Sequence, residues 1–285
     1  MKSILLPLSA QINDENVTRV ASLLAFQFRA TLNGLFIRPD PRAAIPFMGE
    51  GLTADMIQDI CDAADTEGKT QASKAFERYK TRTQELGLPL ADGGQQKDGP
   101  IARWRVVTGQ ITDHAGRKAR TSDLAICAKP IPDFGDSQEM FDDLIFRSGR
   151  PVMMVPEEST EAPGRHVMIA WNGRAEGARA VGVALPLLRS AEKVSLLQIG
   201  EADPERPTIE DVSEYLQDHG VSCKLHKKAR DNTPIGAQIL ASAHEEKADM
   251  VVIGAYSHNR WREMILGGVT KYLIGHSDLP ILMSH

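Results

Sequence analysis

The chain has 285 residues, a length typical of two domains, and its 33 Lys and Arg against 38 Asp and Glu give a formal charge of −5. With 42% hydrophobic and 25% charged residues, it has the composition of a globular protein rather than of a disordered chain. The mild acidity argues against binding to nucleic acid or to an anionic membrane, because both need a clearly basic face. We find no secretory leader and no run of 18 apolar residues, and therefore expect a cytoplasmic protein.

The three cysteines, Cys61, Cys127 and Cys223, lie far apart in the sequence. An odd and scattered set of this kind argues against a disulfide framework and against a structural zinc site. Cys223 and His226 have a spacing that occurs among metal ligands, but on a strand this odd offset points the two side chains to opposite faces. We therefore expect no metal site in the protein itself.

The predicted elements follow one another as strand, helix, strand, and the series occurs twice. Apolar runs typical of strands lie at 3–8, 31–37, 101–108, 122–127 and 150–155, and again at 166–171, 193–199, 221–228, 248–253 and 279–283. Asp123 and Asp249 are 126 positions apart, and Pro151 and Pro280 are 129 apart. A nearly constant offset through several landmarks indicates a duplication.

Strands that alternate with helices predict parallel sheets with right-handed crossovers. The predicted fold is therefore α/β, with two tandem, doubly wound, parallel five-stranded sheets related by a pseudo-two-fold axis. A polar, proline-bounded stretch at 156–164 separates the halves, so the predicted domains are 1–158 and 164–285.

Two further expectations concern packing. The final strands of the halves are apolar and would be exposed edges if left alone, which predicts that they pair with each other as an internal pseudo-dimer. An excursion at 39–99, with a helix predicted over 53–86, separates the second and third strands of the first half. We expect this excursion to cover the crevice of that half.

Ligands of open parallel sheets bind beyond the carboxyl ends of the strands, so the loop after each fourth strand is the place where chemistry is expected. In the second half this strand runs into Gly254, a polar loop, and then Gly267, Gly268, Val269 and Thr270 at the start of a helix. Glycines allow the backbone to approach a phosphate, and amide N–H groups at a helix N-terminus point toward the anion. This loop therefore predicts an anion site.

The tandem repeats and this loop resemble the universal stress proteins, which have an adenine-nucleotide α-hydrolase-like fold. Members of that family that bind ATP show the pattern G-x2-G-x9-G-[S/T], and Gly254, Ser257, Gly267 and Gly268 fall in this frame. Ser257 replaces the second glycine and Gly268 replaces the hydroxyl residue, so the sequence departs from the pattern at two of four positions. Thr270, two residues later, is a candidate for the missing hydroxyl.

The resemblance also implies a pocket for adenine and ribose. Asn172 stands where the family has an acidic residue near the ribose. The backbone near Ala170 and the side chain of Ile199 would flank the adenine, and Ile253 and Gly254 would lie at the mouth of the fourth strand. In the first half the glycine frame is missing, and Asp133 and Asp136 would repel phosphate. We therefore expect one degenerate site and one partly retained site.

Three functions follow from these observations. The first is a stress-response or signalling protein that binds ATP or another adenine nucleotide, with Mg²⁺ if the nucleotide is ATP. The second is a protein-interaction module of the same fold without nucleotide, with a protein partner or a further homodimer. The third, an enzyme, is at most a slow ATP hydrolase, because the sequence contains no catalytic triad and no Walker lysine.

Overall fold

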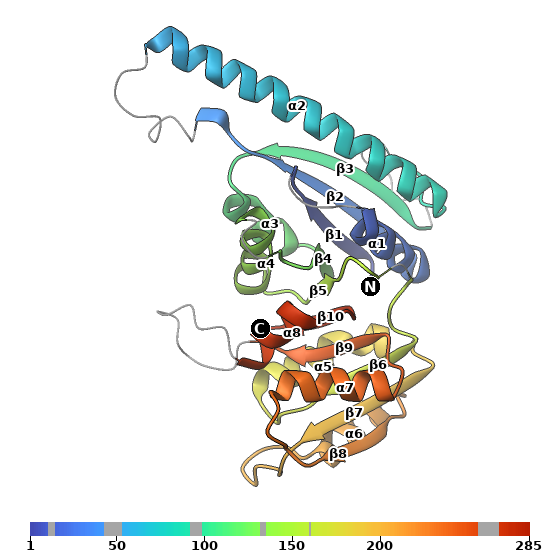
Figure 1. Ribbon diagram of the computed structural model, residues 1–285. Coiled ribbons are helices and arrows are strands. Elements are labelled where there is room, and N and C mark those ends of the chain that lie inside the picture. Colours follow the sequence, from blue (N-terminus) through green and yellow to red (C-terminus); the bar gives the residue numbers. More distant parts are fainter. Residues whose placement is uncertain (11–14, 43–52, 92–98, 132–134, 160, 256–267) are drawn as a thin grey trace.

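A single ten-stranded sheet runs through the protein in the computed structural model, with helices on both faces (Figure 1). The structure describes residues 1–10, 15–42, 53–91, 99–131, 135–159, 161–255 and 268–285. The strand order is β3-β2-β1-β4-β5-β10-β9-β6-β7-β8, so each half contributes five adjacent strands in the same relative order. This arrangement confirms the predicted tandem α/β fold.

The first half alternates strands and helices as its hydrophobic pattern predicts. Its elements are β1 (Ser3–Leu8), α1 (Glu15–Phe28), β2 (Thr31–Arg38), α2 (Ala54–Glu85), β3 (Ile101–Thr108), α3 (Ile111–Ala119), β4 (Leu124–Ala128), α4 (Gly135–Arg147) and β5 (Val152–Val155). The second half repeats the series. It comprises β6 (His166–Ala170), α5 (Ala175–Leu188), β7 (Lys193–Ile199), α6 (Ile209–Asp218), β8 (Lys224–Lys228), α7 (Ile235–Glu245), β9 (Met250–Gly254), α8 (Gly268–His276) and β10 (Ile281–Ser284).

The two halves meet where their final strands pair. β5 and β10 are antiparallel, with Met153 opposite Leu282, whereas the strands within each half pair in parallel. All four residues of each strand are buried. The expected internal pseudo-dimer is therefore confirmed, and the two predicted sheets form one continuous sheet.

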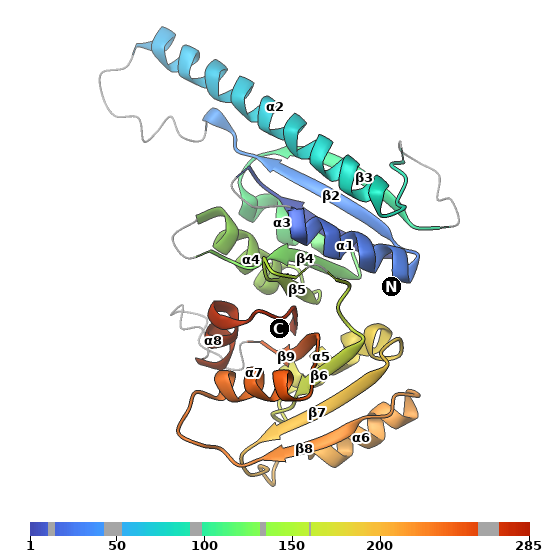
Figure 2. The same cartoon turned by 45° about the vertical axis from the view of Figure 1, so that its right-hand side comes forward.

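Two apolar layers sandwich this sheet, one on each face. One layer gathers side chains from α1, α2, α5 and α6, and the other from α3, α4, α7 and α8 (Figure 2). Within each half the helix pairs thus alternate between faces, as right-handed crossovers require. At the carboxyl ends of the strands, the loops that lead to helices on both faces therefore come together.

The landmark aspartates perform the same task in each half. Asp123 accepts hydrogen bonds from the backbone N–H groups of Lys2 and Ser3, and Asp249 accepts them from Gly164, Arg165 and His166. Each carboxylate thereby fixes the start of the central strand beside it. A shared structural role explains why these positions recur at a constant offset.

The excursion at 39–99 lies elsewhere than we expected. Its helix, α2, packs on α1, β2 and β3, with Tyr79 buried and donating its hydroxyl hydrogen bond to Leu32 O at 3.0 Å. A Cβ at Gly34 would lie 2.8 Å from Trp104 and 2.9 Å from Tyr79, so the strand needs glycine beneath these rings. The expectation that the excursion covers the crevice was wrong for its described part, because α2 is the ordinary crossover helix between β2 and β3, lengthened to 32 residues.

The two outer strands of the sheet, β3 and β8, are rich in basic residues, which discourage edge-to-edge aggregation. At β8 these charges are compensated. Glu246, just after α7, lies 2.8 Å from Lys193 Nζ, 3.3 Å from Lys224 Nζ and 3.5 Å from His226 Nδ1. The hydrogen bond from Lys193 and the surrounding cations lower the pKa of Glu246 to about 2.

This shift predicts an acid-sensitive contribution to stability. Since the folded-state pKa of Glu246 lies below its ordinary value of 4.5, its stabilisation is present above pH 4.5 and is lost as the pH falls toward 2. In wild type, the denaturant concentration at the unfolding midpoint should fall between about pH 5 and about pH 3, and Glu246→Gln should make this fall smaller. Chemical denaturation at each pH measures the midpoint. Glu214→Gln, at an exposed position on α6, is the control and should keep the wild-type slope. Equal slopes for wild type and Glu246→Gln would contradict the assignment.

Candidate functional site

Three apolar residues predicted to flank a ligand lie together at the carboxyl ends of neighbouring strands. Ala170 ends β6, Ile199 ends β7, and Ile253 is the next-to-last residue of β9. Ile253 is 4% exposed and belongs to the apolar layer under α7 and α8, and Ala170 and Ile199 are half-buried against the same layer. The structure thus brings these three side chains to one face of the sheet and one end of the strands.

The first turn of α8 lies on that same face. Gly268 begins the helix and is exposed, Val269 packs partly against the apolar layer, and Thr270 is 4% exposed. N–H groups of a first helical turn have no acceptor within their own helix and carry the positive end of the helix dipole. An anion at this end of the sheet would therefore meet favourable partial charge.

Gly254 ends β9 in close contact with α5. A Cβ there would lie 2.4 Å from the backbone nitrogen of Gly177 and 2.5 Å from the carbonyl carbon of Glu176. The packing of α5 is sufficient to require glycine at this position. One carboxylate oxygen of Glu176, Oε2, is buried and has no hydrogen-bond partner among the described residues, while Oε1 lies 3.9 Å from Arg179 Nη2. Negative charge therefore lies beside this strand end.

Asn172 lies in the turn between β6 and α5 and is exposed. Its Oδ1 accepts a hydrogen bond of 3.1 Å from the backbone N–H of Arg174, and Gly173 between them has φ of +70°. The side-chain amide of Asn172 therefore shapes the turn that leads from β6 into α5. This is the strand end at which the family resemblance places the ribose. Ser257 and Gly267, the two remaining predicted contacts, lie outside the residues that the structure describes.

The first half has a different environment at the corresponding place. A pocket of about 270 Å³ opens between the carboxyl ends of β4 and β5 and the start of α1, with Gly275 of α8 contributing to its wall. Lys129 lies in this pocket and donates from Nζ to Ser277 O at 3.0 Å, across the junction of the halves. Asp136 lies in the first turn of α4, where a phosphate would otherwise be favoured, and Asp133 lies outside the described residues.

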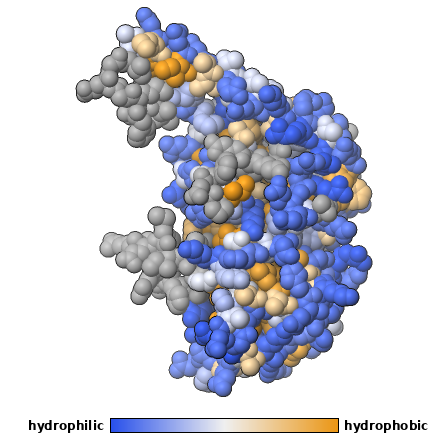
Figure 3. Space-filling model, in the orientation of Figure 1, coloured by the Kyte–Doolittle hydropathy of each residue, from blue (hydrophilic) through white to orange (hydrophobic). Residues whose placement is uncertain are grey.

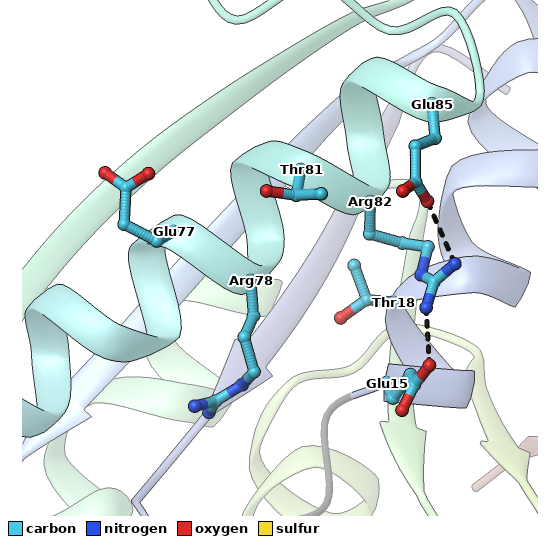
Figure 4. Close-up of a pocket in the computed structure, with 7 residues that line it drawn as sticks. All are labelled: Glu15, Thr18, Glu77, Arg78, Thr81, Arg82 and Glu85. Atoms are coloured by element: carbon cyan, nitrogen blue, oxygen red, sulfur yellow. Dashed lines mark hydrogen bonds and ion pairs between the residues drawn. The ribbon is translucent and has the colours of Figure 1, made fainter.

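A second pocket, of about 390 Å³, lies between α1 and α2 and was not predicted from the sequence (Figure 4). Arg82 extends between Glu15 and Glu85, with nitrogen–oxygen distances of 2.5 and 3.0 Å. Glu77 and Arg78 complete a lining in which opposite charges alternate. The pairing of Arg82 with a residue 67 positions away has no local signature, so the sequence alone could not reveal this pocket.

Comparison with known proteins places this geometry in a family. The model of the Universal stress protein family matches residues 164–285. Residues 164–285 therefore form a universal stress protein domain. The match includes every residue predicted to contact a ligand.

The universal stress protein fold extends over the whole chain. A universal stress protein from Archaeoglobus fulgidus DSM 4304 superposes with a TM-score of 0.70 at 15% identity, covering 99% of this chain and 96% of that one. A protein from Pseudomonas aeruginosa UCBPP-PA14 assigned to the same family covers 100% of this chain and 93% of its own, at 14% identity and a TM-score of 0.57. At these identities the likeness shows the fold of both halves. No curated protein sequence matched the chain significantly.

The described residues contain neither a membrane-spanning helix nor a cluster of metal ligands. No helix there has the length and apolar character needed to cross a membrane. No three His, Cys, Asp or Glu side chains gather there as a metal site would require. Cys223 Sγ contacts Ser213 on α6, whereas His226 faces Glu246 beyond α7, so the two point to opposite faces as predicted.

Proposed function

We propose that this protein binds an adenine nucleotide in its second half and acts in stress response or signalling, with Mg²⁺ present if the nucleotide is ATP. The observation that carries the proposal is the convergence of Ala170, Ile199 and Ile253 with the first turn of α8 on one face at one end of the sheet. Apolar side chains suit a purine ring, and helical N–H groups suit phosphate.

The same site argues for modest affinity. Asn172, unlike the acidic residue of the family pattern, offers a ribose hydroxyl only an uncharged hydrogen bond, which is weaker than a charge-assisted one. The carboxylate of Glu176, a residue in contact with Gly254, is half-buried and opposes phosphate close to that strand end. The phosphates are therefore expected nearer to Gly268, Val269 and Thr270 than to Gly254.

The alternative is a protein-interaction module without nucleotide. The contact of Gly254 with α5 favours this alternative. The contact explains why one glycine of the nucleotide pattern is present, and it does so without any ligand. Calorimetric titration with ATP, AMP and adenosine separates the two functions. The nucleotide proposal predicts one ATP per chain, bound more tightly than adenosine, whereas absence of binding for all three ligands would favour the interaction module.

A further inference from the structure

The outer strand of the first half presents uncompensated arginines, in contrast to its counterpart in the second half. Trp104 packs on Tyr79 of α2, so the alternate residues Arg103 and Arg105 point to the opposite face, the face of α3. Asn33 of β2 and Ser195 of β7 are equivalent positions in the two halves. Asn33 pairs with Arg103 of β3, and Ser195 pairs with Lys224 of β8. Arg103 and Arg105 therefore occupy the positions of Lys224 and His226.

In the described part of the first half, no acidic residue takes the place of Glu246. Neither β3 nor the stretch 114–122 contains Asp or Glu, and α3 adds Arg117 and Lys118. His114 places this part of α3 beside β3, because its Nε2 lies 3.1 Å from Thr108 O and its Nδ1 lies 3.4 Å from Arg117 Nη2. Among the described residues no ion pair involves Arg103, Arg105, Arg117 or Lys118, which together we call the basic face.

The opposite kind of surface lies at the start of α2. Residues 54–64, here called the arm, extend past the end of the sheet, and Arg38 at the end of β2 holds α2 just beyond them through Asp65 at 2.7 Å (Figure 1). The arm contains Asp55, Asp59 and Asp62 and no basic residue. These three aspartates follow the i, i+4, i+7 spacing and so share one side of the helix.

An apolar stripe runs next to the acidic one. Met56 is 49% exposed and Ile60 is 40% exposed, and hydrophobic residues are visible on the surface at this end of α2 (Figure 3). Large apolar side chains at adjacent helical positions on a projecting arm are typical of a helix that becomes covered by a partner. The partner that fits the acidic stripe must be basic.

We propose that the arm of one copy of this protein binds the basic face of a second copy, and that the reciprocal contact closes a symmetric dimer. Along the helix axis, Asp55 and Asp59 are about 6 Å apart and Asp59 and Asp62 about 4.5 Å apart. Arg103 and Arg105 are about 7 Å apart along the strand, so their spacing matches that of Asp55 and Asp59. Because each copy carries both surfaces, a two-fold axis satisfies both at once. This dimer is independent of the β5–β10 pairing and of any nucleotide.

Charge reversal tests this assembly in the full-length protein. Sedimentation velocity at low salt should show a dimer that weakens as salt is added, since the contact is electrostatic. The variant R103E/R105E and the variant D55K/D59K/D62K should each lose self-association by at least about tenfold. A 1:1 mixture of the two variants should restore the dimer, because each interface again joins opposite charges.

Matched controls keep the outcome interpretable. The variant E201K/E205K/E214K makes the same change in net charge as the arm variant D55K/D59K/D62K, at exposed positions of the second half, and should dimerise like wild type. The chain that combines all five reversals in the arm and the basic face should also dimerise. A monomer at low salt, a dimer that both reversals leave unchanged, or mixed variants that stay monomeric would overturn the proposal.

Discussion

Replacing Gly268 with Asp is expected to abolish ATP binding without loss of stability. Gly268 is exposed, and a Cβ there meets no atom of the described residues within 4 Å, so the new side chain fits. An acidic residue in a first helical turn stabilises the helix by about 0.3–1 kcal/mol. The same carboxylate repels phosphate, and a like-charge pair at about 4 Å near a protein surface costs about 4 kcal/mol, enough to weaken binding more than about a hundredfold.

The duplication supplies the control for this experiment. Gly135 begins α4 as Gly268 begins α8, and a Cβ at Gly135 likewise meets no atom within 4 Å. Gly135→Asp should leave ATP binding unchanged, while Gly268→Asp should lower the affinity for ATP far more than that for adenosine. If both variants bind ATP like wild type, the phosphates lie elsewhere. If both lose binding equally, the second half is not the specific site.

The proposed domains 1–158 and 164–285 are expected to lose solubility or to self-associate when they are expressed separately. Val152, Met153, Met154, Ile281 and Met283 are fully buried at the β5–β10 junction. Separation would expose these side chains and would leave β5 and β10 as unpaired edge strands, whose free backbone groups are a template for aggregation. Each half alone should therefore be insoluble or pair with another copy of itself, and co-expression should restore a soluble complex of the two.

Cleavage after folding provides the comparison. A protease site inserted in the linker at 156–164 should allow the chain to be cut while the halves stay together in gel filtration, because the junction and not the peptide bond holds them. Two soluble, monomeric halves, or halves that separate after cleavage, would contradict the central place of this junction.

The sequence predicted the repeated architecture because the features that encode it are local. Apolar runs and their spacing define the strands, and Asp123 and Asp249 mark the strand starts that they cap. The pairing of the two final strands also followed from their composition, since an exposed apolar edge strand needs a partner.

Side-chain packing across the fold lay beyond the sequence. The need for glycine at position 34 depends on two rings from α2 and β3, and the need for glycine at position 254 depends on the approach of α5. Neither contact has a local pattern, so the sequence did not reveal that the packing of α5 requires glycine at position 254. The position of α2 was missed for the same reason, because an apolar stripe shows that a helix face is buried but not which surface covers it.

Charge compensation was equally hidden. β3 and β8 are both basic outer strands, and only the folded structure shows that Glu246 compensates Lys224 and His226. Arg103 and Arg105 have no such partner among the residues that the structure describes. The sequences of these two strands do not predict which acidic side chains lie beside them in the fold. This difference in charge compensation distinguishes halves that otherwise repeat each other.

Photolabelling with 8-azido-ATP tests the location of the nucleotide site most directly, because the reactive group sits on the adenine ring. We expect labelled peptides from the ends of β6 and β7, around Ala170 and Ile199, and we expect unmodified ATP to compete with the labelling. Label in the first-half pocket, on peptides that contain Asn16, Lys129 or Val155, would contradict the assignment of the site to the second half.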